Sequence, residues 1–277
     1  MSNYKELLQT AREFLKDNGI ADADLDAWYL LAHVFGINRA GFFMYGNEEA
    51  SMDKALLYKE LIKKRALHIP LQYLTGTQEF MGLEFDVDEN VLIPRQDTEL
   101  LVEEVLKVCN NKSVLDVCTG SGCIIISLSK LGNLKKAIGT DISQKALQIA
   151  NRNAKKLNAD VNFIQGDLFE RVVGNYDIIV SNPPYIRNEE LKSLMPEVKD
   201  HEPKQALDGG PDGLIFYERI INDLHRYLNP GGYVYFEIGY DQGEAVKEML
   251  YEAGLVDIII KKDFNELDRI VYARKSF

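Results

Sequence analysis

Four consecutive residues have the types and the order needed to hold a primary amide or an exocyclic amine: Asn182, Pro183, Pro184 and Tyr185. They follow an apolar run that ends at Ser181, which predicts that they lie at the carboxyl end of a buried strand, where open α/β sheets bind ligands. The Asn182 side-chain carbonyl accepts hydrogen bonds, and a following proline confines Asn182 to extended geometry. Pro183 lacks an N–H group but keeps its carbonyl. Two fixed acceptors match the two hydrogens of an –NH2 group.

Such a pair of acceptors favours group transfer to nitrogen. An amide nitrogen is a poor nucleophile because its lone pair is delocalised. Acceptors on both N–H bonds let the nitrogen begin to pyramidalise toward an electrophile, and they stabilise the charge that develops there. Tyr185 can stack on the flat face of the group, and an electrophilic methyl in line with the nitrogen makes positioning the main source of rate. No general base is required before transfer, since the methylated, cationic nitrogen is acidic and water or Asn182 could relay its proton.

A second set of residues indicates a nucleoside pocket on the same sheet. Gly120 and Gly122 lie where a predicted strand meets its helix, so the backbone there can approach a ligand closely. Ile125 stands where the dinucleotide fingerprint has its third glycine, and no Gly-Lys-Ser/Thr follows, so neither NAD or FAD nor a phosphate-binding P-loop is favoured. An adenosine ligand without a diphosphate fits best, S-adenosylmethionine being the usual one, and the ordered set that indicates it is Asp116, Gly120, Gly122, Asp141 and Asp167.

The framework that must position these residues is an alternating α/β domain beginning near Thr98. Strands are predicted at SVLDVC, KAIGTDIS, NFIQGD, YDIIVSN and GYVYFEIG, with helices between them and a first helix over 98–109. This alternation predicts a mostly parallel sheet with helices on both faces. The last two strands, VDIIIKKD and RIVYAR, have no helix between them and should pair antiparallel.

The residues before this domain have a different character. Residues 3–67 show apolar positions at helical spacing in three segments, which predicts a small helical unit. Residues 68–95 alternate in polarity around Met81-Gly82, which predicts a β-hairpin that joins the two parts.

The composition restricts the class of partner. The 277 residues have a formal net charge of −11, so the chain has no basic excess with which to bind free DNA or RNA. Three cysteines without a CxxC pair indicate reduced thiols, and the four histidines show no metal-ligand spacing. The N-terminus predicts neither a signal peptide nor a membrane anchor. We therefore expect a cytoplasmic protein that binds no metal.

Five stretches are distinctive: PLQYLTGTQEFMGLEFDVDENVLIPRQDTELLVE (70–103), LDVCTGSGCIIISL (115–128), VSNPPYI (180–186), LDGGPDGL (207–214) and LNPGGYVYFEIGYDQGEAV (228–246). Through them nearly the whole chain resembles the HemK/PrmC family of protein N5-glutamine methyltransferases, which modify class I peptide chain release factors. NPPY alone is shared with adenine and guanine amino-methyltransferases. The IPRQDTE stretch is more specific and favours release factors over ribosomal-protein substrates.

The resemblance implies a fold, a reaction and a set of sites. It implies a class I S-adenosylmethionine-dependent methyltransferase, Rossmann-like with a mostly parallel seven-stranded sheet, an antiparallel last strand and a small N-terminal helical domain. The domains would be 1–76 for substrate recognition, 77–95 as hairpin linker and 96–277 for methyl transfer. The target would be the glutamine of a Gly-Gly-Gln loop, bound between the domains of a monomer.

The family's site residues transfer onto matching positions of this sequence. Catalysis is implied for Asn182, Pro183 and Tyr185, and substrate binding for Asn182, Pro183, Pro184 and Tyr185. Cofactor binding is implied for Cys118, Thr119, Gly120, Ser121, Gly122, Asp141, Asp167, Leu168 and Asn182, and no metal is implied. The family usually has glycine where Cys118 stands, so a positive φ there would strain the cysteine. Arg95, in the IPRQDTE stretch, is expected near the cofactor.

Three alternatives stay open at this point. A ribosomal-protein glutamine methyltransferase, or a nucleic-acid amino-methyltransferase, would use the same NPPY device. A non-catalytic binding module could retain the fold and interact through its helical part, with weak or no cofactor binding.

Overall fold

The computed structural model describes residues 2–277, which divide into two compact units. The smaller unit runs to Thr77 and includes Met195–His201. The larger unit comprises Gln78–Leu194 and Glu202–Phe277. No helix of residues 2–277 has the length and apolar character needed to cross a bilayer.

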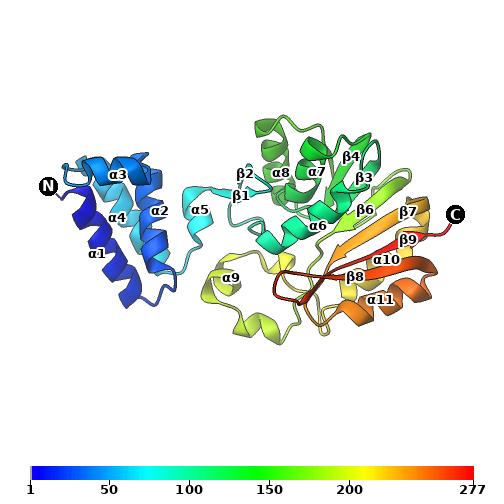
Figure 1. Cartoon of the computed structure of the whole chain (residues 1–277). Coiled ribbons are helices and arrows are strands. Elements are labelled where there is room, and N and C mark those ends of the chain that lie inside the picture. Colours follow the sequence, from blue (N-terminus) through cyan, green and yellow to red (C-terminus); the bar gives the residue numbers. More distant parts are fainter. Residues whose placement is uncertain (1) are drawn as a thin grey trace. The chain divides into compact units, whose positions relative to one another are not determined.

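The smaller unit is helical, as the sequence predicts (Figure 1). Its elements are α1 (Tyr4–Asp17), α2 (Ala23–Phe35), α3 (Arg39–Tyr45), α4 (Met52–Ala66), α5 (Leu71–Thr75) and, from far along the chain, α9 (Pro196–His201). A capping box between Asn3 and Glu6 begins α1. The apolar faces of α1, α2 and α4 form one core, which includes Leu15, Trp28 and Tyr58.

An ion-pair network attaches α9 to this unit. The buried Arg65 places Nε 2.6 Å from Asp26 Oδ2 and Nη2 2.8 Å from Glu197 Oε1. Glu197 lies on α9, and His68 Nδ1 is 3.0 Å from the same oxygen. Because a buried charge is costly without partners, these contacts fix α9 within the unit.

The larger unit is built on a seven-stranded sheet of order β5-β4-β3-β6-β7-β9-β8 (Figure 1). The strands are β3 (Ser113–Val117), β4 (Lys136–Asp141), β5 (Asn162–Gln165), β6 (Tyr176–Ser181), β7 (Leu228–Glu237), β8 (Leu255–Lys262) and β9 (Asp268–Lys275). The pairs along β5-β4-β3-β6-β7 are parallel, whereas β9 is antiparallel to both β7 and β8. The predicted mostly parallel sheet with an antiparallel last strand is confirmed.

Helices cover both faces of this sheet. They are α6 (Gln96–Leu106), α7 (Cys123–Leu131), α8 (Gln144–Lys156), α10 (Ile215–Tyr227) and α11 (Gly243–Glu252), with short 3-10 turns η1 (Glu190–Ser193) and η2 (Lys204–Ala206). Successive strand residues point to opposite faces. Val114 and Ile178 join a core with α6 and α7, whereas Leu115 and Ile179 join a core with α10 and α11. Central strands that are buried on both faces explain the continuous apolar runs in the sequence.

The predicted hairpin is confirmed as β1 (Thr77–Phe80) and β2 (Leu83–Asp86), with the turn at Met81 and Gly82. Its Phe80 and Phe85 rings are buried and meet edge to face, with centroids 6.0 Å apart. They pack against α6 and α7, so they belong to the core of the larger unit.

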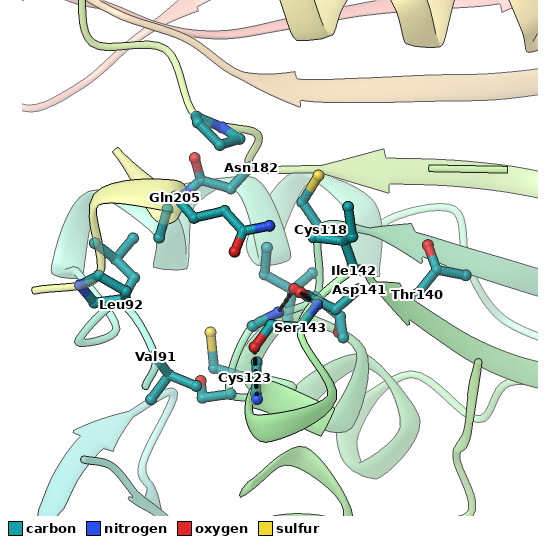
Figure 2. Close-up of a pocket in the computed structure, with 18 of the residues that line it drawn as sticks. Val91, Leu92, Cys118, Cys123, Thr140, Asp141, Ile142, Ser143, Asn182 and Gln205 are labelled. Atoms are coloured by element: carbon teal, nitrogen blue, oxygen red, sulfur yellow. Dashed lines mark hydrogen bonds between the residues drawn. The ribbon is translucent and has the colours of Figure 1, made fainter. Parts of the chain in front are cut away.

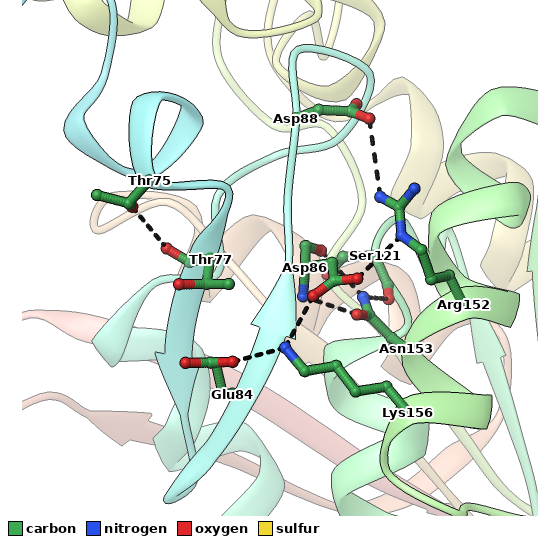
Figure 3. Close-up of polar contacts among 9 residues, drawn as sticks. All are labelled: Thr75, Thr77, Glu84, Asp86, Asp88, Ser121, Arg152, Asn153 and Lys156. Carbon is green, nitrogen blue, oxygen red and sulfur yellow. Dashed lines mark hydrogen bonds and ion pairs between the residues drawn. The ribbon is translucent and has the colours of Figure 1, made fainter. Parts of the chain in front are cut away.

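The second hairpin strand is tied to α8 by polar contacts (Figure 3). The Asp86 N–H donates to Asn153 Oδ1 at 2.7 Å, and Asn153 Nδ2 donates to the carbonyls of Asp86 and Ser121 at 3.1 and 3.0 Å. Lys156 Nζ lies 2.7 Å from Glu84 Oε1 and 2.8 Å from Asp86 Oδ1. The buried Asn153 therefore links the hairpin to the glycine turn that follows β3.

Some boundaries and elements differ from the sequence predictions. The helix expected over 98–109 begins at Gln96, since the acidic Asp97 and Glu99 lie in its first turn and favour a start there. The β7 strand begins at Leu228 because that residue pairs with Tyr176 across a register shift. The helices α3 and α5 were not predicted as separate elements, nor were η1, α9 and η2.

Candidate active site

A pocket opens at the carboxyl ends of β3, β4 and β6 (Figure 2). The chain leaves β3 toward β4 and β5 on one side and returns through β6 on the other, so this is the switch point at which open α/β sheets bind ligands. Val117 pairs with Ser181, whose hydroxyl donates to the Val117 carbonyl at 2.6 Å. Cys118 and Asn182 come next along these strands. The two sets of residues singled out in the sequence therefore meet at one sheet edge.

Most of the residues expected to bind cofactor or substrate line this pocket: Cys118, Thr119, Gly120, Ser121, Asp141, Asp167, Leu168, Asn182 and Pro184. Its empty space is about 1140 Å³, part of it open to solvent. Gly122, Pro183 and Tyr185 are not among the lining residues.

The turn after β3 has the shape of a ligand cradle. Gly120 has a φ of 55°, and a Cβ added there would meet nothing within 4 Å, so its backbone is open to the pocket. Gly122 faces inward, where a Cβ would lie 2.8 Å from Ile126 Cδ1 and 3.2 Å from Ala150 Cβ. The two glycines therefore differ in role: Gly120 leaves space for a ligand, whereas Gly122 lets the helices that carry Ile126 and Ala150 pack closely.

Cys118 has the positive φ that was considered for this position because the family usually has glycine there. Its φ is 64°, in the left-handed region that costs a residue with a Cβ about 1–2 kcal/mol. Burial raises the pKa of its thiol, as do the nearby carboxyls of Asp141 and Asp116, so the thiol stays protonated. Cys118 is therefore a neutral wall of the pocket.

Asp141 ends β4 and organises the pocket floor. Its Oδ2 accepts from the Gly120 N–H at 2.9 Å, and its Oδ1 accepts from the Ser143 N–H at 2.8 Å. Burial raises the pKa of the Asp141 carboxyl, whereas these backbone N–H groups lower it. A carboxylate has about four lone-pair sites, so each oxygen can still accept a hydroxyl from a ligand.

Asp116, on β3 beneath the turn, is completely buried. Its Oδ2 accepts from the Thr119 hydroxyl at 2.5 Å, while Oδ1 has no hydrogen-bond partner within residues 2–277. Burial is the largest cause that raises the pKa of Asp116, to about 7, and the Asp141 charge adds to it.

This shift predicts a pH-dependent stability. Because the folded pKa of Asp116 lies above the unfolded value of 3.8, the folded state binds more protons between about pH 4 and 7. Its contribution to the free energy of unfolding should fall as pH rises through that window, by at most about 1.4 kcal/mol per pH unit. We expect Asp116→Asn to lose this slope in urea unfolding series at stepped pH. Parallel pH curves for variant and wild type would contradict the assignment.

Asp167 and Leu168 follow β5 at the other side of the pocket. Asp167 Oδ2 lies 2.7 Å from Arg219 Nη2, an ion pair with α10. Leu168 has a φ of 53°, and its side chain belongs to the core. These contacts fix the conformation of a turn whose two residues both face the pocket.

Asn182 has a defined orientation at the end of β6. Its Nδ2 donates to Thr98 Oγ1 at 3.3 Å. Thr98 is buried in the first turn of α6 and also lines the pocket. Because the amide nitrogen is used in this way, Oδ1 is the atom left to accept a hydrogen bond from a ligand.

Tyr185 lies against the core beside the pocket. Its hydroxyl donates to Glu237 Oε1 at 3.4 Å, and its carbonyl accepts from Gln242 Nε2 at 3.0 Å. Burial raises the pKa of the Tyr185 phenol, so the hydroxyl stays protonated and can act as a donor. A stacking role for this ring stays a prediction.

The segment after Tyr185 is clamped by the loop LDGGPDGL. The Ile186 N–H donates to the Leu207 carbonyl at 3.0 Å, and the Gly209 N–H donates to the Ile186 carbonyl at 2.9 Å. Gly213 has a φ of 78°, and a Cβ there would lie 2.3 Å from the Tyr185 carbonyl oxygen. The distinctive glycines of this loop thus allow it to pack on the NPPY backbone.

Gly213→Ala is therefore expected to lower turnover by at least about tenfold, because the Tyr185 backbone must shift. Gly174→Ala is the matched control, since Gly174 has a φ of 87° but no neighbour within 4 Å of an added Cβ. Both variants should lose about 1–2 kcal/mol of stability from the positive φ. Melting temperatures and turnover measured on both variants check this. Equal turnover in the two variants would contradict the claim that packing of the LDGGPDGL loop holds the Tyr185 backbone in place.

Arg95 also lines the pocket, as expected, and it is anchored. Its Nη2 is ion-paired with Glu202 Oε1, and Glu202 Oε2 accepts from the Ile93 N–H at 3.4 Å. Burial raises the pKa of Glu202, and the Arg95 charge lowers it. The buried Glu202 thereby fixes the IPRQDTE segment along the pocket.

Several lining residues were not predicted from the sequence: Thr98, Ile142, Ser143, Gln205, Phe216 and Arg219. Ser143 could have been found, because it caps α8 by accepting from the Ala146 N–H directly after Asp141. Thr98 belongs to the distinctive IPRQDTE stretch. Gln205 and Arg219 have no local signal, since only the folded chain brings them to the pocket.

Two protein-family models match this chain, one in its N-terminal helical part and one in the part that contains the pocket. The family described as the PrmC N-terminal domain matches residues 6–76. The family described as the methyltransferase small domain matches residues 95–207.

Full-length relatives share one description. The release factor glutamine methyltransferase of Geobacter sulfurreducens is 40% identical over 98% of this chain and 96% of the relative. That of Clostridium acetobutylicum is 41% identical over 98% of this chain and 95% of its own.

Solved structures share the fold at low identity. A methyltransferase from Pyrococcus furiosus superposes with a TM-score of 0.56 at 19% identity, over 72% of this chain and 91% of that chain. A 16S rRNA methyltransferase of T. thermophilus, solved with AdoMet and guanosine, gives 0.53 at 17% identity, over 72% and 49%. These similarities show a methyltransferase fold.

Proposed function

We propose, because the chain belongs to the family of release factor glutamine methyltransferases, that it methylates the side-chain amide nitrogen (N5) of the Gly-Gly-Gln glutamine in class I peptide chain release factors. The observation that best supports this reaction is Asn182, which donates Nδ2 to Thr98 at the edge of the pocket and so leaves Oδ1 free to accept. The substrates are translation factors, so we place the reaction in the cytoplasm.

The pocket fits S-adenosylmethionine as the cofactor. Gly120 leaves open space for a close approach, and the Asp141 carboxylate has lone pairs left for ribose hydroxyls. Residues 118–121, Asp167 and Leu168 line the pocket and would complete the cofactor contacts, with Gly122 giving the turn its shape and Asn182 between cofactor and substrate. When bound, this cofactor supplies an electrophilic methyl group.

The chain's own residues would act on the amide. Asn182 Oδ1 and the Pro183 carbonyl would accept its two N–H groups, while Pro184 and Tyr185 would confine its plane. These acceptors gain strength as the nitrogen becomes positive, so they stabilise the transition state more than the ground state. The half-buried Tyr185 and the clamped loop after it would hold this geometry fixed without a conformational cost at each turnover.

We assign substrate recognition to residues 1–76, the joint to the hairpin segment 77–95 and methyl transfer to residues 96–277. The enzyme would act as a monomer on its release factor. The net charge of −11 supports a protein rather than a free nucleic acid as the substrate.

The test is methyl transfer from labelled S-adenosylmethionine to a class I release factor, intact or with its loop glutamine replaced by alanine. We expect label in the intact protein alone. Equal labelling of both would overturn the proposal. Label in ribosomal protein, or label that RNase removes, would favour the alternative glutamine or nucleic-acid substrates. A titration with S-adenosylhomocysteine that shows no binding would favour a non-catalytic module.

A further inference from the structure

A turn at the pocket edge of the sheet presents a large apolar side chain to solvent. The turn over 263–267 joins β8 to β9, and Phe264 within it is 85% exposed. Because β9 is antiparallel to β7, the first residues of β9 lie where β7 ends, at the same edge at which Asn182 follows β6 (Figure 1). The proposed chemistry uses no residue of this turn, so the exposure of Phe264 at this edge requires another reason.

The strand register places the turn close to the proposed amide site. Ser181 at the end of β6 pairs with Phe236 on β7, and the next β7 residue, Glu237, pairs with Ile270 on β9. Neighbouring strands lie about 4.8 Å apart, so β9 begins about 10 Å to the side of Asn182.

Two more exposed apolar side chains accompany Phe264. The Ile238 N–H donates to the Arg269 carbonyl at 2.9 Å, so the pairing of β7 with β9 continues past its last strand residues. Two residues further, the same register brings Tyr240 to the level of Leu267, and these side chains belong to residues that are 59% and 44% exposed. We call Tyr240, Phe264 and Leu267 the apolar rim.

Polar contacts fix the backbone that carries the rim. The buried Asp263 accepts through Oδ1 from the Leu267 N–H at 3.1 Å, and its own N–H donates to the Leu267 carbonyl at 2.8 Å. Arg269 Nη2 lies 3.1 Å from Asp263 Oδ2 and 3.4 Å from Asp97 Oδ2, which lies in the first turn of α6. Phe264 is therefore presented by an ordered turn, which reduces the entropy that a partner loses on binding it.

A protein that delivers a glutamine to Asn182 must cover the apolar rim. A standard protein interface buries about 800 Å² on each partner, which corresponds to a disc of about 16 Å radius. Such a disc centred on Asn182 includes a turn that begins about 10 Å away. Aromatic side chains near the centre of an interface frequently supply most of its binding energy. The position of Phe264 therefore suits a contact with the substrate protein.

The charges around the apolar rim favour a protein as the partner. Glu266 and Asp241 are exposed, and Asp97 is partly exposed. Arg187 pairs with Asp241 at 2.8 Å, whereas Arg269 is shared between two carboxylates. The remaining negative charge repels a phosphate backbone. An apolar centre with a charged periphery is the usual composition of a protein interface.

We propose that the apolar rim is a docking surface for the release factor, which brings an apolar patch with cationic side chains around it, beside its Gly-Gly-Gln loop. The inference rests on the proposed function and deepens it by assigning where the substrate protein is held outside the amide site. The rim contributes to affinity for the release factor and takes no part in methyl transfer.

The first test shortens the most exposed side chain. Phe264→Ala should raise the Kd for a class I release factor, measured by calorimetry with S-adenosylhomocysteine present, by about tenfold or more. Both kcat at saturating release factor and the Kd for S-adenosylhomocysteine should change less than about twofold, because the pocket is unaltered. Tyr251→Ala is the matched control: it removes a 74% exposed tyrosine near the end of α11, at the opposite edge of the sheet, and should bind as wild type.

The second test separates a contact from a structural defect. Phe264→Tyr keeps the aromatic ring and should retain release-factor affinity within about threefold of wild type. Leu267→Ala, at the other end of the turn, should also raise the Kd for the release factor, by about threefold or more. All variants should keep the wild-type melting temperature within about 2 °C, because the altered side chains are exposed.

The outcomes separate the two levels of inference. A wild type that labels no release factor would overturn the proposed function and this inference with it. A labelling wild type together with an unchanged release-factor Kd in Phe264→Ala would overturn this inference alone. So would a Phe264→Ala variant that loses kcat and keeps its affinity. A wild type that sediments as a dimer, with an equally active but monomeric Phe264→Ala variant, would assign the rim to self-association instead.

Discussion

Asn182→Ala is expected to lower kcat for methyl transfer by about a hundred- to a thousandfold, the effect of removing one preorganised charge-stabilising group. The alanine variant loses Oδ1, the acceptor that we assign to the substrate N–H. S-adenosylhomocysteine affinity should stay largely intact, because the pocket retains Asp141 and the open turn at Gly120. Single-turnover kinetics and calorimetry, measured on the same variant, separate the two effects.

Asn188→Ala serves as its control, because Asn188 is exposed a few residues along the same loop. It should keep wild-type turnover. An Asn182→Ala enzyme with unchanged kcat would refute the role assigned to that side chain. A variant that lost cofactor binding in proportion to turnover would move Asn182 from the amide site to the cofactor site.

Asp141→Ala is expected to raise the Kd for S-adenosylhomocysteine by about a hundredfold or more, since hydrogen bonds to a charged group contribute about 1.5–3 kcal/mol each. The variant removes the acceptor proposed for the ribose hydroxyls. It also leaves the Gly120 and Ser143 N–H groups without their partner, which loosens the turn itself. Calorimetric titration measures the change.

Asp160→Ala, which removes an exposed carboxylate before β5, is the matched control and should bind as wild type. The Kd of Asp141→Asn for S-adenosylhomocysteine should lie between those of Asp141→Ala and the Asp160→Ala control. The asparagine amide keeps one acceptor oxygen and presents a donor where the second oxygen was. Wild-type affinity in Asp141→Ala would show that the nucleoside lies elsewhere.

The strands and both halves of the pocket could be predicted because their signals are local. A strand buried on both faces is an apolar run, as at Ile178 and Ile179, and the turn after it needs small or polar residues. Asn182 and the Gly120 turn follow such runs directly. Their meeting was also predictable, since parallel strands end at the same edge of a sheet.

The partners of these residues could not be predicted, because they are distant in sequence. Thr98 is 84 positions from Asn182, and Glu237 is 52 positions from Tyr185. Nothing in the local pattern around Glu237 distinguishes it from another polar residue at a strand end. Only the strand order, with β7 beside β6, brings it behind the NPPY segment.

The surroundings of Cys118 also could not be predicted from the sequence. The family's usual glycine suggested a left-handed backbone, and the φ of 64° shows that this chain keeps that backbone with a side chain present. The core contact of the Cys118 side chain is a compensation that only the folded structure reveals.

The most direct test of the proposed amide site is a crystal structure of the enzyme bound to S-adenosylhomocysteine and to a class I release factor with its Gly-Gly-Gln loop. It should place Asn182 Oδ1 and the Pro183 carbonyl oxygen each about 2.7–3.2 Å from the glutamine side-chain nitrogen, with the cofactor sulfur on the opposite side of that nitrogen. If either oxygen points away from the bound amide, or if the cofactor lies outside the pocket at Asp141, the account is contradicted.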